Sequence, residues 1–110
     1  MVTVPPAFAA RQVLDAAVER EERWPASLVE ASSGTVAQAL AAAGRGVAVV
    51  SDDARYDLHG LRIRSGGRDL SVRLFVAWSS THPAEQALAA LAERLRSFVV
   101  RAYPSTTPRA

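Results

Sequence analysis

The residues of this chain best suited to hold a small molecule lie in two short loops, each followed by a helix-forming stretch. The first loop is Val4–Phe8 and the second is Glu30–Thr35. The first turn of a helix carries backbone N–H groups without helical partners and a partial positive charge, so each loop favours an anion. The second loop adds the hydroxyls of Ser32, Ser33 and Thr35, while Gly34 permits close backbone approach. The alternative is that Ser32 or Ser33 simply caps the helix.

Catalytic patterns are weak elsewhere in the chain. Ser51, Asp52 and His59 are close in sequence, but no sharp strand-turn-helix motif surrounds the serine. The stretch Gly44–Gly46 follows a helix and precedes a strand, which is the reverse of the order that a phosphate loop needs. His82 stands next to a proline and is best interpreted as a helix-start residue. The sequence therefore predicts no enzyme, no cofactor and no metal site.

Composition limits the remaining classes. A chain of 110 residues with 49% hydrophobic and 22% charged residues has room for one folded domain with one core. All 13 positive residues are arginines, the net charge is only +2, and acidic residues are interspersed among them, so we expect no direct contact with nucleic acid. There is no cysteine and no apolar run of membrane-spanning length. A cytoplasmic location is the simplest expectation.

The first half of the chain alternates strands and helices. Its patterns predict a strand at Val2–Val4, followed by a helix that begins at Ala7 and ends at Trp24–Pro25. A second strand is predicted around Leu28–Val29, followed by a helix through Val36–Ala43 that Gly44 terminates. The continuous apolar run Val47–Val50 predicts a strand covered on both faces. We therefore expect an α/β domain, a single small three-layer unit with a parallel β-α-β-α-β core and right-handed crossovers.

The second half predicts a different arrangement. A polar loop, 52–60, precedes a half-buried strand around Leu61–Arg64. Gly66-Gly67 predicts a tight reversal into a longer antiparallel strand, Leu70–Trp78. Pro83 then opens a C-terminal helix, with Thr81 or His82 as its cap. Its apolar face comprises Leu88, Leu91, Leu95, Phe98 and Val99.

Several segments together resemble the effector (substrate)-binding domain of LysR-type transcriptional regulators. Val36–Ala43 followed by Gly44–Val50 is similar to the "v-x-a-L-V-A-A-G-x-G-V-A" segment of that family, and Arg11 with Leu14-Asp15 resembles its "R-x-x-L-D". Leu74–Trp78, followed by His82-Pro83 and an amphipathic helix, resembles its closing strand and helix. Arg45 departs from the family pattern, as do Ser51 at the strand end and the charged loop that follows.

The resemblance implies a type 2 periplasmic-binding-protein-like lobe. Residues 2–103 would be effector-binding, with 2–78 as the second lobe, 79–103 as a returning helix and 104–110 as a flexible tail. The small effector would contact Pro6, Ala7, Phe8, Ser32, Ser33, Gly34 and Thr35, and would control DNA binding by an N-terminal helix-turn-helix that this chain lacks. With half a cleft, the chain would bind its effector weakly, and the full-length protein would be a homo-oligomer.

Two other functions remain open from the sequence. A solute-binding lobe of a periplasmic transport protein has the same two-lobed architecture. A small self-associating α/β module without a ligand could pair through the apolar face of the C-terminal helix.

Overall fold

The computed structural model describes residues 1–103, which divide into two compact units at Val72 and Arg73. The first unit, Met1–Val72, contains a parallel sheet, two helices and a hairpin, and the second contains one long helix. The predicted flexible tail, 104–110, lies outside the described residues. A small α/β fold with a parallel sheet is confirmed.

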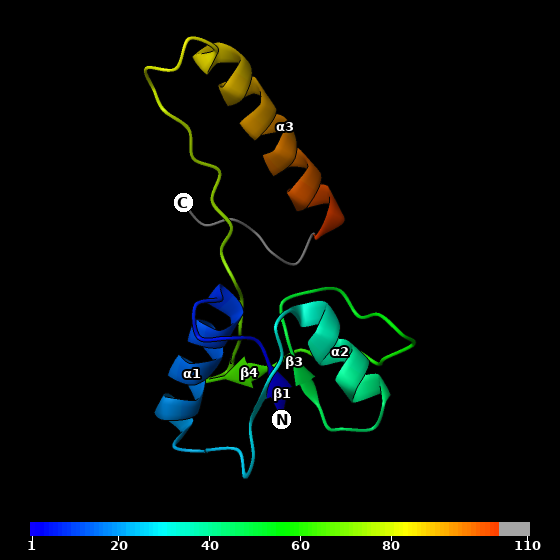
Figure 1. Cartoon of the computed structure of the whole chain (residues 1–110). Helices are drawn as coiled ribbons and strands as arrows, with labels where there is room; N and C mark the ends of the chain where they lie inside the picture. The colour runs from blue at the N-terminus through cyan, green and yellow to red at the C-terminus, as the bar shows by residue number, and fades with distance from the viewer. Residues whose placement is uncertain (104–110) are drawn as a thin grey trace. The chain divides into compact units, whose positions relative to one another are not determined.

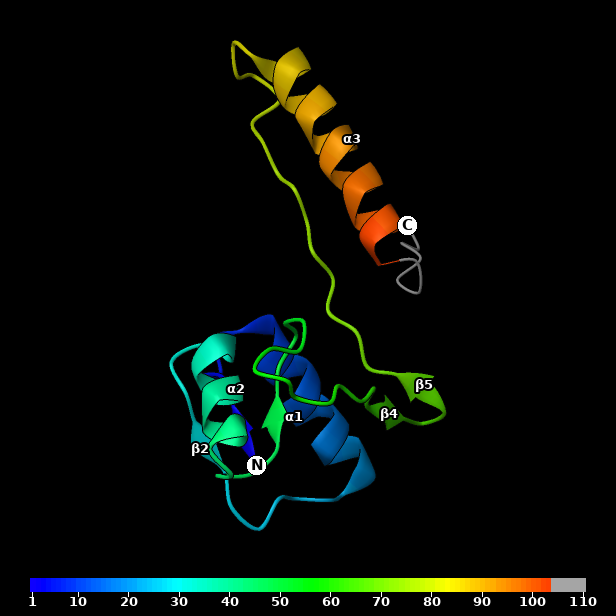
Figure 2. The same cartoon turned by 90° about the vertical axis from the view of Figure 1, so that its right-hand side faces the viewer.

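The sheet of the first unit has three short strands, β1 (Val2–Thr3), β2 (Val29–Glu30) and β3 (Ala48–Val49). The strand order is β2-β1-β3, and β1 pairs in parallel with both neighbours. In Figure 1, β1 and β3 lie between the two helices of the unit, and Figure 2 shows the same unit turned by 90° with β2 labelled. The central strand is the most buried part, because Val2, Thr3 and Val4 are at most 2% exposed.

The β-branched run at the start of the chain therefore forms the centre of the core. Ala31 and Ala37 pack with Val2, and Leu40, Ala48 and Val50 cover this cluster. The hydroxyl of Thr3, which has no access to solvent, donates to the Val49 carbonyl oxygen at 2.8 Å. This bond satisfies a polar group that would be costly to bury alone, and it ties the centre of the sheet to β3.

The run Val47–Val50 was predicted to be covered on both faces, and that prediction is wrong. Val47 is 72% exposed, and β3 is half-buried. The reason is the strand order, since β3 lies at an edge of the sheet and β1 takes the doubly covered position.

The bounds of the two helices of the first unit differ from the prediction: α1 is shorter at both ends, whereas α2 begins before Val36 and ends before Ala43. Helix α1 spans Ala9–Glu21, and Glu22 closes it in the left-handed conformation (φ 50°), so it ends before the predicted Trp24–Pro25 stop. Helix α2 spans Gly34–Ala42. Gly44 has φ +77°, as predicted for the residue that ends this helix.

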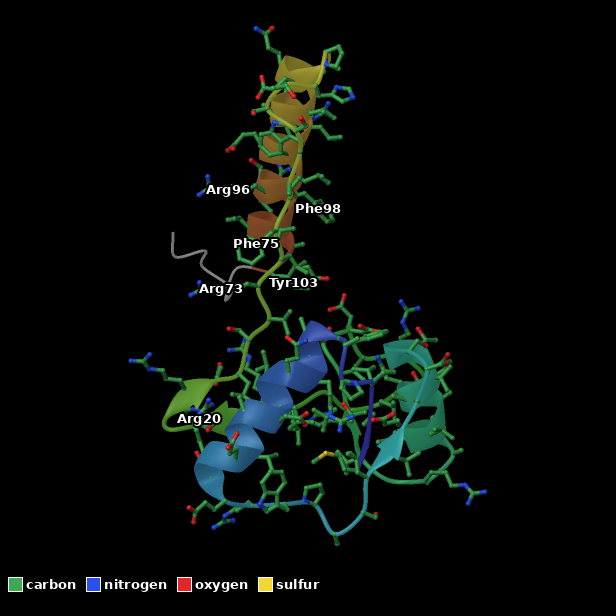
Figure 3. All side chains as sticks on the ribbon, turned by 60° about the vertical axis from the view of Figure 1, so that its left-hand side comes forward. Arg20, Arg73, Phe75, Arg96, Phe98 and Tyr103 are labelled. Carbon is green, nitrogen blue, oxygen red and sulfur yellow. The ribbon has the colours of Figure 1, made fainter. Side chains whose placement is uncertain are left out.

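A two-stranded hairpin follows, made of β4 (Arg64–Ser65) and β5 (Arg68–Asp69). Its two-residue turn is Gly66-Gly67, with φ +57° and +76°, which confirms the predicted reversal. The end of α1 anchors it: the hydroxyl of Ser65 donates to Glu21 Oε1 at 2.7 Å, and Arg20 contacts Ser65 Oγ at 3.4 Å (Figure 3).

The second unit corrects two predictions. Residues 71–78 form no strand, and Leu74 and Phe75 are 82% and 84% exposed; an alternating pattern becomes a strand only where a neighbour pairs with it. Helix α3 spans Glu85–Ala102 with Ala84 as its N-cap, so neither Thr81 nor His82 is the cap residue. His82 still supports the helix start, because its Nδ1 accepts the Ala84 N–H at 3.0 Å.

Candidate functional site

The candidate site is the carboxyl-terminal edge of the parallel sheet. Strands β1 and β2 run side by side in register, with Thr3 opposite Glu30, and the Ala31 N–H donates to the Thr3 carbonyl oxygen at 2.7 Å. The loop before α1 and the loop before α2 leave from the ends of these two neighbouring strands. Because the strands are parallel, both loops open at the same edge, as ligand-binding loops do in open α/β sheets.

The start of α2 is capped by its own serine. Ser33 is the N-cap residue, and its Oγ accepts the Val36 N–H at 3.2 Å. Ser32 and Thr35 are exposed, whereas Gly34 is buried. The capping interpretation of Ser33 is therefore confirmed, and the Thr35 hydroxyl is left facing solvent for other partners.

The start of α1 has no such cap. Phe8 is the N-cap residue, and its side chain makes no capping hydrogen bond. Pro6, Ala7 and Phe8 are all exposed. Within residues 1–103 no acceptor binds the N–H groups of the first two helical residues, Ala9 and Ala10. Backbone donors without a partner at a helix start attract an anion.

A guanidinium joins the two strand ends. Arg11, whose side chain is only 11% exposed, donates from Nη1 to the Val4 carbonyl oxygen at 3.2 Å and to Glu30 Oε1 at 2.9 Å. Its Nε donates to Asp15 Oδ1 at 2.9 Å. These bonds to Asp15 and Glu30 raise the pKa of Arg11 above its ordinary value, so the residue is a fixed positive charge at the edge.

A third loop, which follows β3, folds over the start of α2. The carboxyl group of Asp52 lies against Gly34, so closely that a methyl group on Gly34 would stand 2.7 Å from Asp52 Cγ. Gln38 of α2, which is 2% exposed, holds this loop by both ends of its amide. Its Nε2 donates to the Asp53 carbonyl oxygen at 3.0 Å, and its Oε1 accepts the Arg55 N–H at 2.7 Å.

The other chemistry-bearing residues do not converge on this edge. Ser51 and His59 are exposed, and within residues 1–103 no three His, Cys, Asp or Glu side chains gather as a metal site would require. A hollow of about 260 Å³ lies along α1, and its lining includes Arg11 and Asp15 of that helix together with Met1, Trp24, Pro25 and Leu28, which precede β1 and β2 in the chain. None of the helices described is both long and apolar enough to span a bilayer.

Sequence reasoning found the two strand-to-helix loops but missed three residues that shape the edge, Arg11, Gln38 and Asp52. Arg11 offered one signal, its i,i+4 spacing to Asp15, although its bonds to Val4 and Glu30 require the strands to be paired. Gln38 offered none, because a glutamine in a helical pattern is normally solvated.

A small α/β unit whose loops meet at the carboxyl edge of a parallel sheet is a typical ligand-binding lobe. Comparison with protein families identifies which one: the model of the LysR substrate binding domain matches residues 1–99. The chain therefore belongs to the LysR substrate-binding domain family, the ligand-sensing domains of transcription regulators. No curated protein and no solved structure matched the chain in parallel comparisons.

Proposed function

We propose that this chain senses a small effector at the carboxyl edge of its sheet and that effector binding controls DNA binding by the helix-turn-helix of a cytoplasmic transcription regulator. The residues proposed to contact the effector are those of the two loops, Pro6, Ala7, Phe8, Ser32, Ser33, Gly34 and Thr35. The chain acts by binding alone and catalyses no reaction on the effector.

The observation that carries this proposal is the in-register pairing of β1 with β2, because it brings both loops to one edge. The loops offer complementary groups there. The α1 loop supplies exposed apolar surface from Phe8, and the α2 loop supplies the exposed hydroxyl of Thr35. A small molecule with an apolar body and a few polar groups fits such a surface.

The proposed effector carries an anionic group that binds at the start of α1. The free N–H groups of Ala9 and Ala10 favour an acceptor there, and Arg11, the next residue of the helix, adds a positive charge in the same first turn. Asp15 and Glu30 already engage Arg11, so the anion gains mainly from the backbone donors.

The two units are proposed to have separate places in the complete sensing domain. Residues 2–78 are the second lobe and 79–103 a returning helix. The apolar face of α3 supports this assignment, because Leu91, Leu95 and Phe98 are 44–59% exposed in this chain. Phe98 of this face is labelled in Figure 3. In the complete domain this face packs on the first lobe, which closes the cleft over the effector.

The experiment is a binding screen read by NMR. The ¹⁵N-labelled chain is titrated with a panel of small aliphatic and aromatic carboxylates, and we expect one class to shift the amide signals of Ala9, Ala10 and Thr35 while those of Gly44–Gly46 at the opposite edge stay unchanged. Shifts confined to Gly44–Gly46, or to the hollow beside α1, would move the binding site elsewhere.

Variants then test the loop residues. Thr35→Val removes a hydroxyl that has no partner within residues 1–103, so it is expected to weaken binding without changing stability. Ser33→Ala also removes the helix cap, which costs about 1 kcal/mol of stability, so its fold is checked by circular dichroism. Ser80→Ala, an exposed hydroxyl in the second unit, is the matched control. Unchanged affinity in both loop variants would reject the site.

A second candidate function is self-association through α3. All five residues of its predicted apolar face are at least partly exposed, and no residue of α3 is buried. Size-exclusion chromatography at two protein concentrations tests this candidate: a shift to larger size on concentration supports it, and a strict monomer at both concentrations excludes it.

A further inference from the structure

The start of α2 differs from the start of α1 in one respect: a carboxylate of the chain itself already lies on it. Asp52, in the loop after β3, places its carboxyl group against Gly34, the first residue of the helix. The methyl group of an alanine at position 34 would overlap that carboxyl group. Only glycine leaves room for this contact.

The contact is held in place by a buried side chain. Gln38 lies one turn along α2 from Gly34, is 2% exposed, and bonds the backbone on both sides of Ala54. Because both its donor and its acceptor are used, the loop that carries Asp52 has a defined path over the first turn of the helix. Gln38 is thus a positioning residue for Asp52.

A carboxylate at this place puts a negative charge beside the start of α2, where an anionic ligand would otherwise bind. A negative charge near a helix N-terminus is stabilised by the helix dipole and the free N–H groups, here those of Gly34 and Thr35. A second anion would meet the like charge of Asp52 at close range, which disfavours its binding. At the start of α1 the situation differs, because the nearby carboxylates of Asp15 and Glu30 are paired with the guanidinium of Arg11.

We propose that Asp52 is a specificity-determining residue that closes the α2 end of the site to anions and selects a hydrogen-bond donor or a cationic group of the effector there. This inference rests on the proposed function and refines it. The sequence suggested that both loops attract an anion, whereas on this proposal only the α1 loop does. The effector then has an anionic end and a donor or cationic end, bound at the starts of two adjacent helices.

The test uses sulfate as the probe and the amide signals of Gly34 and Thr35 as the readout, with ionic strength held constant by NaCl. In the unmodified chain these signals are expected to show weak or no saturation. In Asp52→Asn they are expected to report binding tighter by about tenfold or more, as removal of a like charge at close range implies. Asp53→Asn, the same charge change one residue along, is the matched control and is expected to behave as the unmodified chain.

Gln38→Ala tests whether the position of the Asp52 carboxylate matters, because this substitution leaves the net charge of the chain unchanged. If Asp52 acts through its held position, Gln38→Ala also tightens sulfate binding at Gly34 and Thr35. Equal sulfate affinity in the unmodified chain and Asp52→Asn would overturn the proposal, as would an equal gain in Asp53→Asn. The carboxylate screen tests the proposed function through the signals at the start of α1, whereas the sulfate titration is read at the start of α2. Failure of the proposed function and failure of the role of Asp52 can therefore be told apart.

Discussion

Gln38 offers the most sensitive test of how the loop after β3 is held. Gln38→Ala removes two hydrogen bonds, of 3.0 Å to the Asp53 carbonyl oxygen and 2.7 Å from the Arg55 N–H. Each such bond contributes about 1 kcal/mol net, and the lost buried methylene adds about 0.8 kcal/mol. Alanine recovers about 0.4 kcal/mol through its higher helix propensity. The expected loss is therefore about 2 to 3 kcal/mol in the free energy of unfolding of the first unit.

Native-state hydrogen exchange measures this loss within the first unit alone. The Ala31 N–H, bonded to Thr3 in the centre of the sheet, reports global opening of that unit. Gln12→Ala is the matched control, since Gln12 is exposed and makes one long bond, 3.4 Å, to the Pro6 carbonyl oxygen. It is expected to stay within about 0.5 kcal/mol of the unmodified chain. A loss in Gln38→Ala no larger than in Gln12→Ala would refute the reasoning.

Three further predictions concern stability. Leu14→Ala, at a site 6% exposed in α1, is expected to cost about 2 to 4 kcal/mol by the same hydrogen-exchange measurement; a cost below about 1 kcal/mol would contradict the burial of Leu14. Gly44→Ala is expected to lower the free energy of unfolding by about 1 kcal/mol, because φ at this position is +77°. The added methyl group would meet nothing within 4 Å, so the cost comes from the backbone alone. A neutral result in thermal unfolding would contradict the left-handed end of α2. The Ser65 hydroxyl and the Gly66 N–H lower the pKa of Glu21 below its ordinary value of 4.5. The contact between Glu21 and the hairpin therefore stabilises the folded state fully above pH 4.5, and this stabilisation is lost as the pH falls through the lowered pKa. Glu21→Gln should remove that acid-induced change in the hairpin amide signals, and an unchanged pH profile would reject the anchor.

Local patterns predicted those parts of the fold that depend on a few adjacent residues. The glycine pair at 66-67 and the left-handed Gly44 are such cases, because the required backbone angles are accessible mainly to glycine. Ser33 as the cap of α2 is another. The β-branched run at the N-terminus also predicted its strand.

Predictions failed where the outcome depends on distant partners. The run Val47–Val50 is apolar enough for a central strand, yet strand order places it at an edge. Residues 71–78 alternate as a strand does, but within residues 1–103 no neighbouring strand pairs with them. For the site, the spacing of residues indicated two donor-rich loops, whereas Asp52 meets Gly34 only because β3 ends at the same edge as β1 and β2.

The account depends above all on the loops before α1 and α2 opening at one edge of the sheet. Since the chain has no cysteine, Ser32→Cys accepts a single spin label at an exposed position. Paramagnetic broadening is expected to be strongest for amides in residues 7–10 and 50–53, and weaker in residues 24–27 and 43–46, which precede β2 and β3 at the other edge. Stronger broadening in residues 24–27 and 43–46 than in residues 7–10 would place the two loops at opposite edges and contradict the proposed site.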